Sequence, residues 1–106
     1  MSMKLAEELK KQSRRNPLVL YYEGLIHDLR VEASYGGNHK VVVISKSYYN
    51  DVCKKLLASG FTVIINNYNE DNASFMTFIV WDKEKFDEAL KDNTDIDKTT
   101  FHYGLV

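Results

Sequence analysis

The chain has 106 residues, 44% of them hydrophobic, with a formal net charge of −1 and a pI near 6.3. This length predicts one domain that folds without a metal or disulfide, and the near-neutral balance excludes a global attraction to DNA or anionic membranes. The single cysteine, Cys53, excludes an internal disulfide. No apolar run reaches membrane-spanning length, so we expect a soluble, cytoplasmic protein with no membrane partner.

The N-terminal third predicts two helices. Residues 3–15 are strong helix formers with a thin apolar stripe. Asn16 and Pro17 suit the cap and first turn of a second helix. Residues 18–22 could instead form a strand, but apolar positions spaced three and four apart continue through residues 18–33, which favours the helix.

A strand, a helix and a hairpin follow. The run HKVVVI, residues 39–44, is rich in β-branched residues and predicts a strand buried on both faces. Ser45 or Ser47 is expected to cap the next helix. Strands over 61–65 and 74–81, joined by a short polar loop, predict an antiparallel hairpin.

The C-terminal part predicts one helix and a tail. Asp82 is expected to cap the helix DKEKFDEALKD, and Trp81 and Phe86 are spaced for a hydrophobic staple. Residues 92–100 are polar and predict a loop. The last six residues, FHYGLV, are apolar enough to dock as a short strand.

Together these elements predict one α+β domain with the order α-α-β-α-β-β-α. We expect a small mixed sheet of three to four strands with the helices mainly on one face. The chain divides into an N-terminal helical arm (1–16), a core (17–91) and a C-terminal tail (92–106). A small sheet has much exposed edge, which favours a homo-oligomer.

No motif predicts catalysis, a metal site or a cofactor. The three histidines have no ligand spacing to one another or to Cys53, which lies on an apolar helix face typical of a small buried hydrophobe. Ser45 and Ser47 follow a strand but lack the glycines of a nucleophile elbow. The acidic residues of 82–97 alternate with lysines, as on a solvated helix face.

Aromatic and basic side chains are the candidates for binding. Adjacent tyrosines point to different sides of a helix, so the seven tyrosines cannot all be core. Tyrosine is frequent at contact surfaces and stacks on bases, although tyrosines that only rim the core remain the alternative. Lysine and arginine side chains could bind an anionic ligand. The candidate binding residues are Tyr21, Tyr22, Tyr48, Tyr49, Tyr68, Lys46, Arg14 and Arg15.

The segment VVVISKSYYNDVCKKLLASGFTVII, followed by FMTFIVW, resembles a pattern common in small tailed-phage proteins of unassigned function. The resemblance covers residues 17–82 and carries no catalytic residues. It implies a phage or mobile-element origin. That origin would suit a virion component, an inhibitor of a host factor or a scavenger of a defence signal.

We therefore hypothesise a non-enzymatic binding protein that acts in the host cytoplasm by occupying a host (defence) protein or a small nucleotide signal. The first alternative is a nucleic-acid-binding accessory protein that uses the basic run KKQSRR, residues 10–15. The second is a structural component of a virion. An enzyme is the least favoured class, because no residues are spaced for bond-making chemistry.

Overall fold

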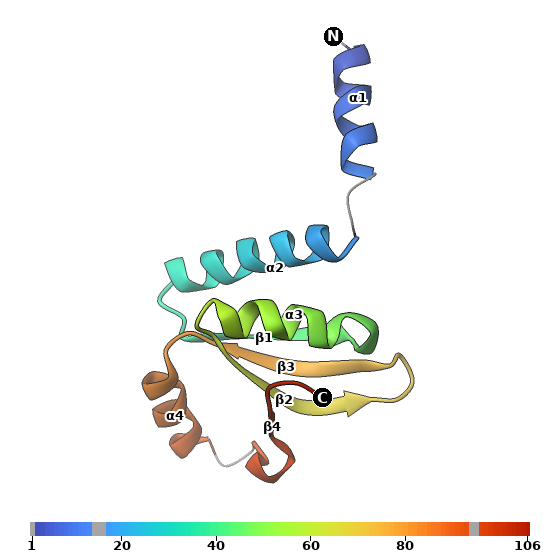
Figure 1. The fold of residues 1–106 in the computed structure, drawn as a ribbon. Helices are drawn as coiled ribbons and strands as arrows, with labels where there is room; N and C mark the ends of the chain where they lie inside the picture. Colours follow the sequence, from blue (N-terminus) through green and yellow to red (C-terminus); the bar gives the residue numbers. More distant parts are fainter. Residues whose placement is uncertain (1, 14–16, 94–95) are drawn as a thin grey trace.

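The computed structural model describes residues 2–13, 17–93 and 96–106, with backbone alone for residues 2, 3 and 11–13 (Figure 1). The predicted α+β class and the order of the first seven elements are confirmed, and residues 18–22 are helical. No helix in the described ranges combines the length and hydropathy needed to span a bilayer. The elements are α1 (Ser2–Ser13), α2 (Pro17–Ser34), β1 (His39–Ser45), α3 (Lys46–Ala58), β2 (Thr62–Asn69), β3 (Ser74–Val80), α4 (Lys83–Asp92), the 3₁₀ turn η1 (Lys98–Thr100) and β4 (His102–Tyr103).

The four strands form one sheet in the order β1-β3-β2-β4, and each neighbouring pair is antiparallel. The expected mixed sheet is therefore not observed. β1 and β2 run in the same direction, but β3 lies between them and pairs with both. The predicted hairpin of β2 and β3 is confirmed, and the tail docks through two residues of β4, with Tyr103 opposite Ile64.

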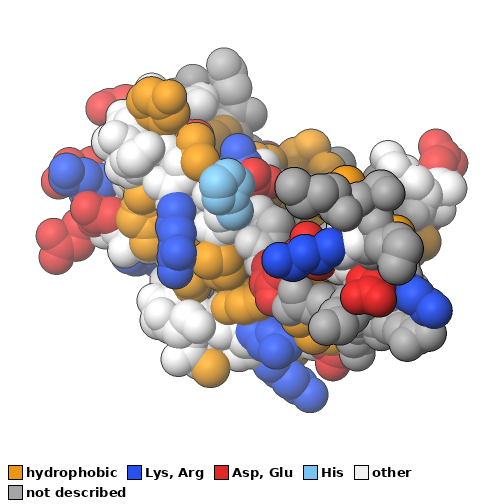
Figure 2. Space-filling view, turned by 90° about the horizontal axis from the view of Figure 1, so that it is seen from above, with side chains coloured by type: hydrophobic (Ala, Val, Ile, Leu, Met, Phe, Trp, Pro, Cys, Tyr) orange, Lys and Arg blue, Asp and Glu red, His pale blue; other side chains and the backbone are white. Residues whose placement is uncertain are grey.

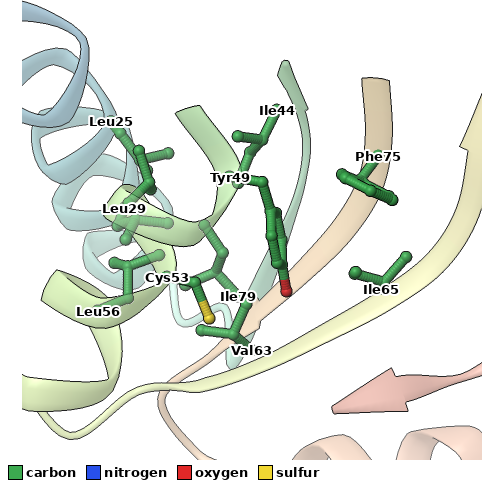
Figure 3. Packing of buried hydrophobic residues seen from close by; sticks show 11 residues of the cluster. Leu25, Leu29, Ile44, Tyr49, Cys53, Leu56, Val63, Ile65, Phe75 and Ile79 are labelled. Atoms are coloured by element: carbon green, nitrogen blue, oxygen red, sulfur yellow. The ribbon is translucent and has the colours of Figure 1, made fainter. Parts of the chain in front are cut away.

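β3 is buried on both sides and separates two hydrophobic clusters. On one face, α2 and α3 contribute Leu25, Leu29 and Leu56, which pack toward Ile79 of β3 (Figure 3). On the other face, α4 covers Phe78 of β3 in a smaller cluster. Two of the three helices that pack on the sheet thus share one face. Burial of this kind contributes roughly 25 cal/mol per Å² of apolar area, so β3 anchors both layers.

The α4 cap is confirmed, but the staple beside it is not formed. The Asp82 side chain accepts a hydrogen bond from the backbone N–H of Lys85 (3.2 Å). Trp81 packs with the α2–α3 cluster, whereas Phe86 packs on the opposite face of the sheet. Trp81 instead donates its Nε1–H to the carbonyl oxygen of Gly37 (2.9 Å). The chain therefore crosses the sheet plane between these two aromatic residues.

The start of α3 is not capped by a serine side chain. Ser45 occupies the N-cap position without a side-chain cap bond, and Ser47 lies within the helix. The backbone N–H of Lys46 donates to the carbonyl oxygen of Ala73 in the β2–β3 loop (2.8 Å). A tertiary contact thus satisfies one of the free N–H donors at the start of the helix.

The C-terminal segment is held against α3 by polar contacts. The Tyr49 hydroxyl donates to the carbonyl oxygen of Gly104 (2.6 Å). The Asn50 side chain donates to the Val106 carbonyl oxygen and accepts from the Val106 N–H, both at 3.0 Å. Residues 102–106 are therefore part of the folded body and close the sheet beside β2.

We expect Tyr49→Phe to lower the free energy of unfolding by about 1–2 kcal/mol, because the Gly104 carbonyl loses its donor while the ring still fills the core. Tyr48→Phe is the matched control, since the same change one residue earlier should stay within about 0.5 kcal/mol of wild type. Urea unfolding measures both. Equal stability of the two variants would show that the Tyr49 bond does not hold the tail.

His39 links stability to pH. Its ring meets Phe86 and Phe78 edge-on, with centroids 4.8 and 5.8 Å apart. Burial lowers the pKa of His39, and the charge of Glu32 opposes this shift in part. The folded chain therefore disfavours the imidazolium more than the unfolded chain does.

We expect the urea midpoint to be highest above pH 6.5 and to fall as the pH drops through that value, because protons then bind preferentially to unfolded chains. His39→Gln should remove most of this slope between pH 7.5 and 5.5 while leaving the carboxylate-driven loss at lower pH. A slope that is identical in His39→Gln would assign the effect to another group.

Candidate functional site

The predicted binding residues do not form one site. Tyr21 and Tyr48 stack on one another, with ring centroids 6.2 Å apart and planes 17° apart. The Tyr21 hydroxyl also donates to the carbonyl oxygen of Val43 in β1 (3.3 Å). Each ring of this pair already occupies one face of the other, so only the outer faces could meet a base or a partner.

Lys46, at the start of α3, lies beside Tyr68 of β2. The Lys46 Nζ lies 5.9 Å from the Tyr68 ring centroid, a cation–π distance. Tyr68 is 38% exposed and packs against Phe75, with centroids 4.9 Å apart. The pair therefore offers a ligand one partly exposed ring and one positive charge.

The remaining predicted residues differ from one another. Tyr49 is fully buried, so it is a core residue and not the surface contact expected from the sequence. Burial raises its pKa, and the interaction with Cys53 acts in the same direction. Tyr22 is half-buried with the Nζ of Lys55 5.4 Å from its ring centroid. Arg14 and Arg15 lie outside the described residues.

Two open grooves flank α2. The α2–α3 groove, about 460 Å³, is lined by Tyr22, Ile26, Phe61 and Trp81, with Arg30 as its charged residue. The α2–β1 groove, about 440 Å³, lies on the other side of α2. Its wall and floor are Leu20, Tyr21, Gly24, Leu25, Asp28 and Val43. Apart from Tyr21, the residues of the α2–β1 groove were not predicted, since nothing local distinguishes them from core or surface positions.

Neither groove holds groups arranged for bond-making chemistry. Among the described residues that line them, the charged side chains are Arg30 in one groove and Asp28 in the other. Within residues 2–13, 17–93 and 96–106, no three His, Cys, Asp or Glu side chains come together to hold a metal ion. Cys53 is fully buried, and burial raises the pKa of its thiol. A protonated, enclosed thiol is a poor nucleophile.

α1 presents apolar side chains away from the body. Leu5 is 58% exposed and Leu9 is 56% exposed. Figure 1 shows α1 projecting from the start of α2, clear of the sheet. In Figure 2, which looks down on this side, the positive and negative side chains that are coloured are interspersed.

Comparison with protein-family models, curated proteins and solved structures finds no match to this chain.

We expect Cys53 to react with a thiol reagent such as DTNB at least about 100-fold more slowly in the native protein than in 6 M guanidinium, because it is buried and protonated. Tyr49→Phe removes a hydroxyl beside the thiol, so the DTNB rate of this variant tests whether local opening exposes Cys53. A native rate close to the unfolded rate would place the thiol within reach of solvent.

Proposed function

We propose that this is a non-enzymatic binding protein that engages another protein through α1. The observation that carries the proposal is the exposure of Leu5 and Leu9 on a helix that projects from the body. An isolated 12-residue helix is marginal in water, since nucleation costs more than so few hydrogen bonds return. A partner that covers the leucines would supply the missing stabilisation.

The charge of the arm indicates the chemistry of that partner. Residues 1–15 carry five basic residues against Glu7 and Glu8. An amphipathic helix with this balance fits an apolar groove with an acidic rim, which is the helix-in-groove mode of recognition. An inhibitor of a host factor, the role implied by the phage resemblance, is one form of this function.

A nucleic-acid-binding protein is the second candidate, because the basic run of residues 10–15 adjoins the leucines. The two candidates depend on different side chains. Binding to phosphates would depend on the basic side chains and weaken steeply with salt. Binding to a protein groove would depend on Leu5 and Leu9.

A photo-crosslinking amino acid placed at position 9 of the full chain should form a nuclease-resistant protein adduct in lysate of the native host. The same probe at position 7, about 200° away around the helix, is the matched control and should form none. Leu5→Ala should weaken the adduct while urea stability stays within about 0.5 kcal/mol of wild type, because Leu5 is exposed.

An adduct that disappears on nuclease treatment would support nucleic-acid binding and contradict binding to a protein. Equal labelling from positions 7 and 9 would exclude the leucine stripe as the contact.

A further inference from the structure

β1 is an edge strand with a row of outward backbone groups. Its seven residues pair on one side only, with β3. Next to the strand, the carbonyl of Asn38 accepts from the N–H of Trp81 (3.1 Å) and the N–H of Lys46 donates to Ala73 (2.8 Å). In an antiparallel ladder, successive residues alternate between facing the partner strand and facing away. His39, Val41 and Val43 therefore point their N–H and C=O groups outward.

The outward direction at Val43 has independent support. The Tyr21 hydroxyl of α2 reaches the Val43 carbonyl oxygen from outside the sheet (3.3 Å). A carbonyl oxygen has two lone pairs, so it can still accept a backbone N–H. The N–H groups of Val41 and Val43 and the Val41 carbonyl oxygen remain as a template for another strand.

α2 packs over this edge of the sheet. Among the strands it packs chiefly against β1, whereas α3 packs against β1, β2 and β3. Figure 1 shows α2 beyond β1, past the margin of the sheet. The α2–β1 groove lies between the two, about 440 Å³ in volume. A strand added 4.7–4.9 Å from β1 would run into this groove with α2 covering one of its faces.

The neighbours of such a strand specify its side chains. On the α2 side it would meet Leu20, Leu25 and Val42 in the groove. On the opposite side it would lie beside Val41 and Val43, which are 45% and 57% exposed. Side chains alternate along a strand, so both faces of the incoming segment would be apolar. Asp28 in the groove favours a basic residue and disfavours an acidic one.

We propose that the α2–β1 groove binds an extended segment of another polypeptide, apolar on both faces and basic, which adds to β1 as a fifth strand. This site is separate from α1 and does not depend on the function proposed above. Strand addition supplies affinity through backbone hydrogen bonds and specificity through the side-chain groove.

An antiparallel pair of two copies through β1 is disfavoured by α2. A two-fold axis normal to the sheet would place both α2 helices on one face, over the same two strands. Strands lie 4.7–4.9 Å apart, whereas packed helices need 8–10 Å. The occupant that fits this groove is therefore a segment without an overhanging helix.

Gly24 provides a test that separates binding from folding. It lies in the groove wall, and a Cβ added there would meet no atom within 4 Å. Gly24→Leu should therefore fill the groove while raising or preserving the urea midpoint, since a glycine inside a helix is destabilising. Ala33→Leu adds a leucine to the same helix on the α2–α3 groove and is the matched control.

The probe is the synthetic peptide NHKVVVISK, the sequence of residues 38–46, which is apolar on both strand faces, carries two lysines and lacks α2. Hydrogen exchange on the full chain should show that the peptide protects the Val41 and Val43 amides. Gly24→Leu should weaken peptide binding roughly tenfold or more, and Ala33→Leu should leave it unchanged. The same peptide with Val42→Pro should bind far more weakly, because it loses a ladder donor.

Charge provides a second readout. Replacing both peptide lysines with glutamate should weaken binding to the wild-type protein more than it weakens binding to the Asp28→Asn variant. A double-mutant cycle measures this difference. Failure of the peptide to protect Val41 and Val43, or unchanged affinity in Gly24→Leu, would overturn the proposal. A dimer of the protein alone with these two amides protected would contradict the argument against a second copy.

Discussion

The burial of β3 on both faces is the constraint on which the rest of the structure depends. Thr77 and Ile79 are fully buried toward α2 and α3, and Phe78 is buried toward α4. Because β3 also pairs with strands on both sides, its backbone groups are satisfied within the sheet. β3 therefore offers a ligand little beyond Met76, which is 40% exposed, and the margins of the sheet are the more accessible surfaces.

Those margins are unequal. β4 covers Ile64 and Ile65 on the β2 side of the sheet, and the tail is fixed there through Tyr49 and Asn50. Within the part of the chain that the structure describes, no strand pairs with the outer side of β1, and α2 stands over it without filling the space beneath. The exposed leucines of α1 form a separate apolar surface. The arm and the groove could engage two polypeptides, or two parts of one, without competing for the same residues.

The tyrosines illustrate how composition points to contact without locating it. Their number indicates a contact surface, yet Tyr49 fills the core, and Tyr21 stacks on Tyr48. Tyr68, in β2, lies beside Lys46 and packs on Phe75. Only Tyr21 lies in the α2–β1 groove, where its hydroxyl meets the strand edge. Adjacent residues of a helix point in different directions, so two tyrosines that are neighbours in the sequence do not form a single surface patch.

The sequence by itself determined the local elements. Apolar spacing, the Asp82 cap and the run of β-branched residues in β1 act through near neighbours, so the α+β class, the element order and the β2–β3 hairpin could be predicted. Tertiary structure alone decided the insertion of β3 between β1 and β2, the separation of Trp81 from Phe86, and the overhang of α2. These depend on which distant surfaces bury the most apolar area together, a free energy that local spacing does not encode. The α2–β1 groove exists only because of that long-range choice.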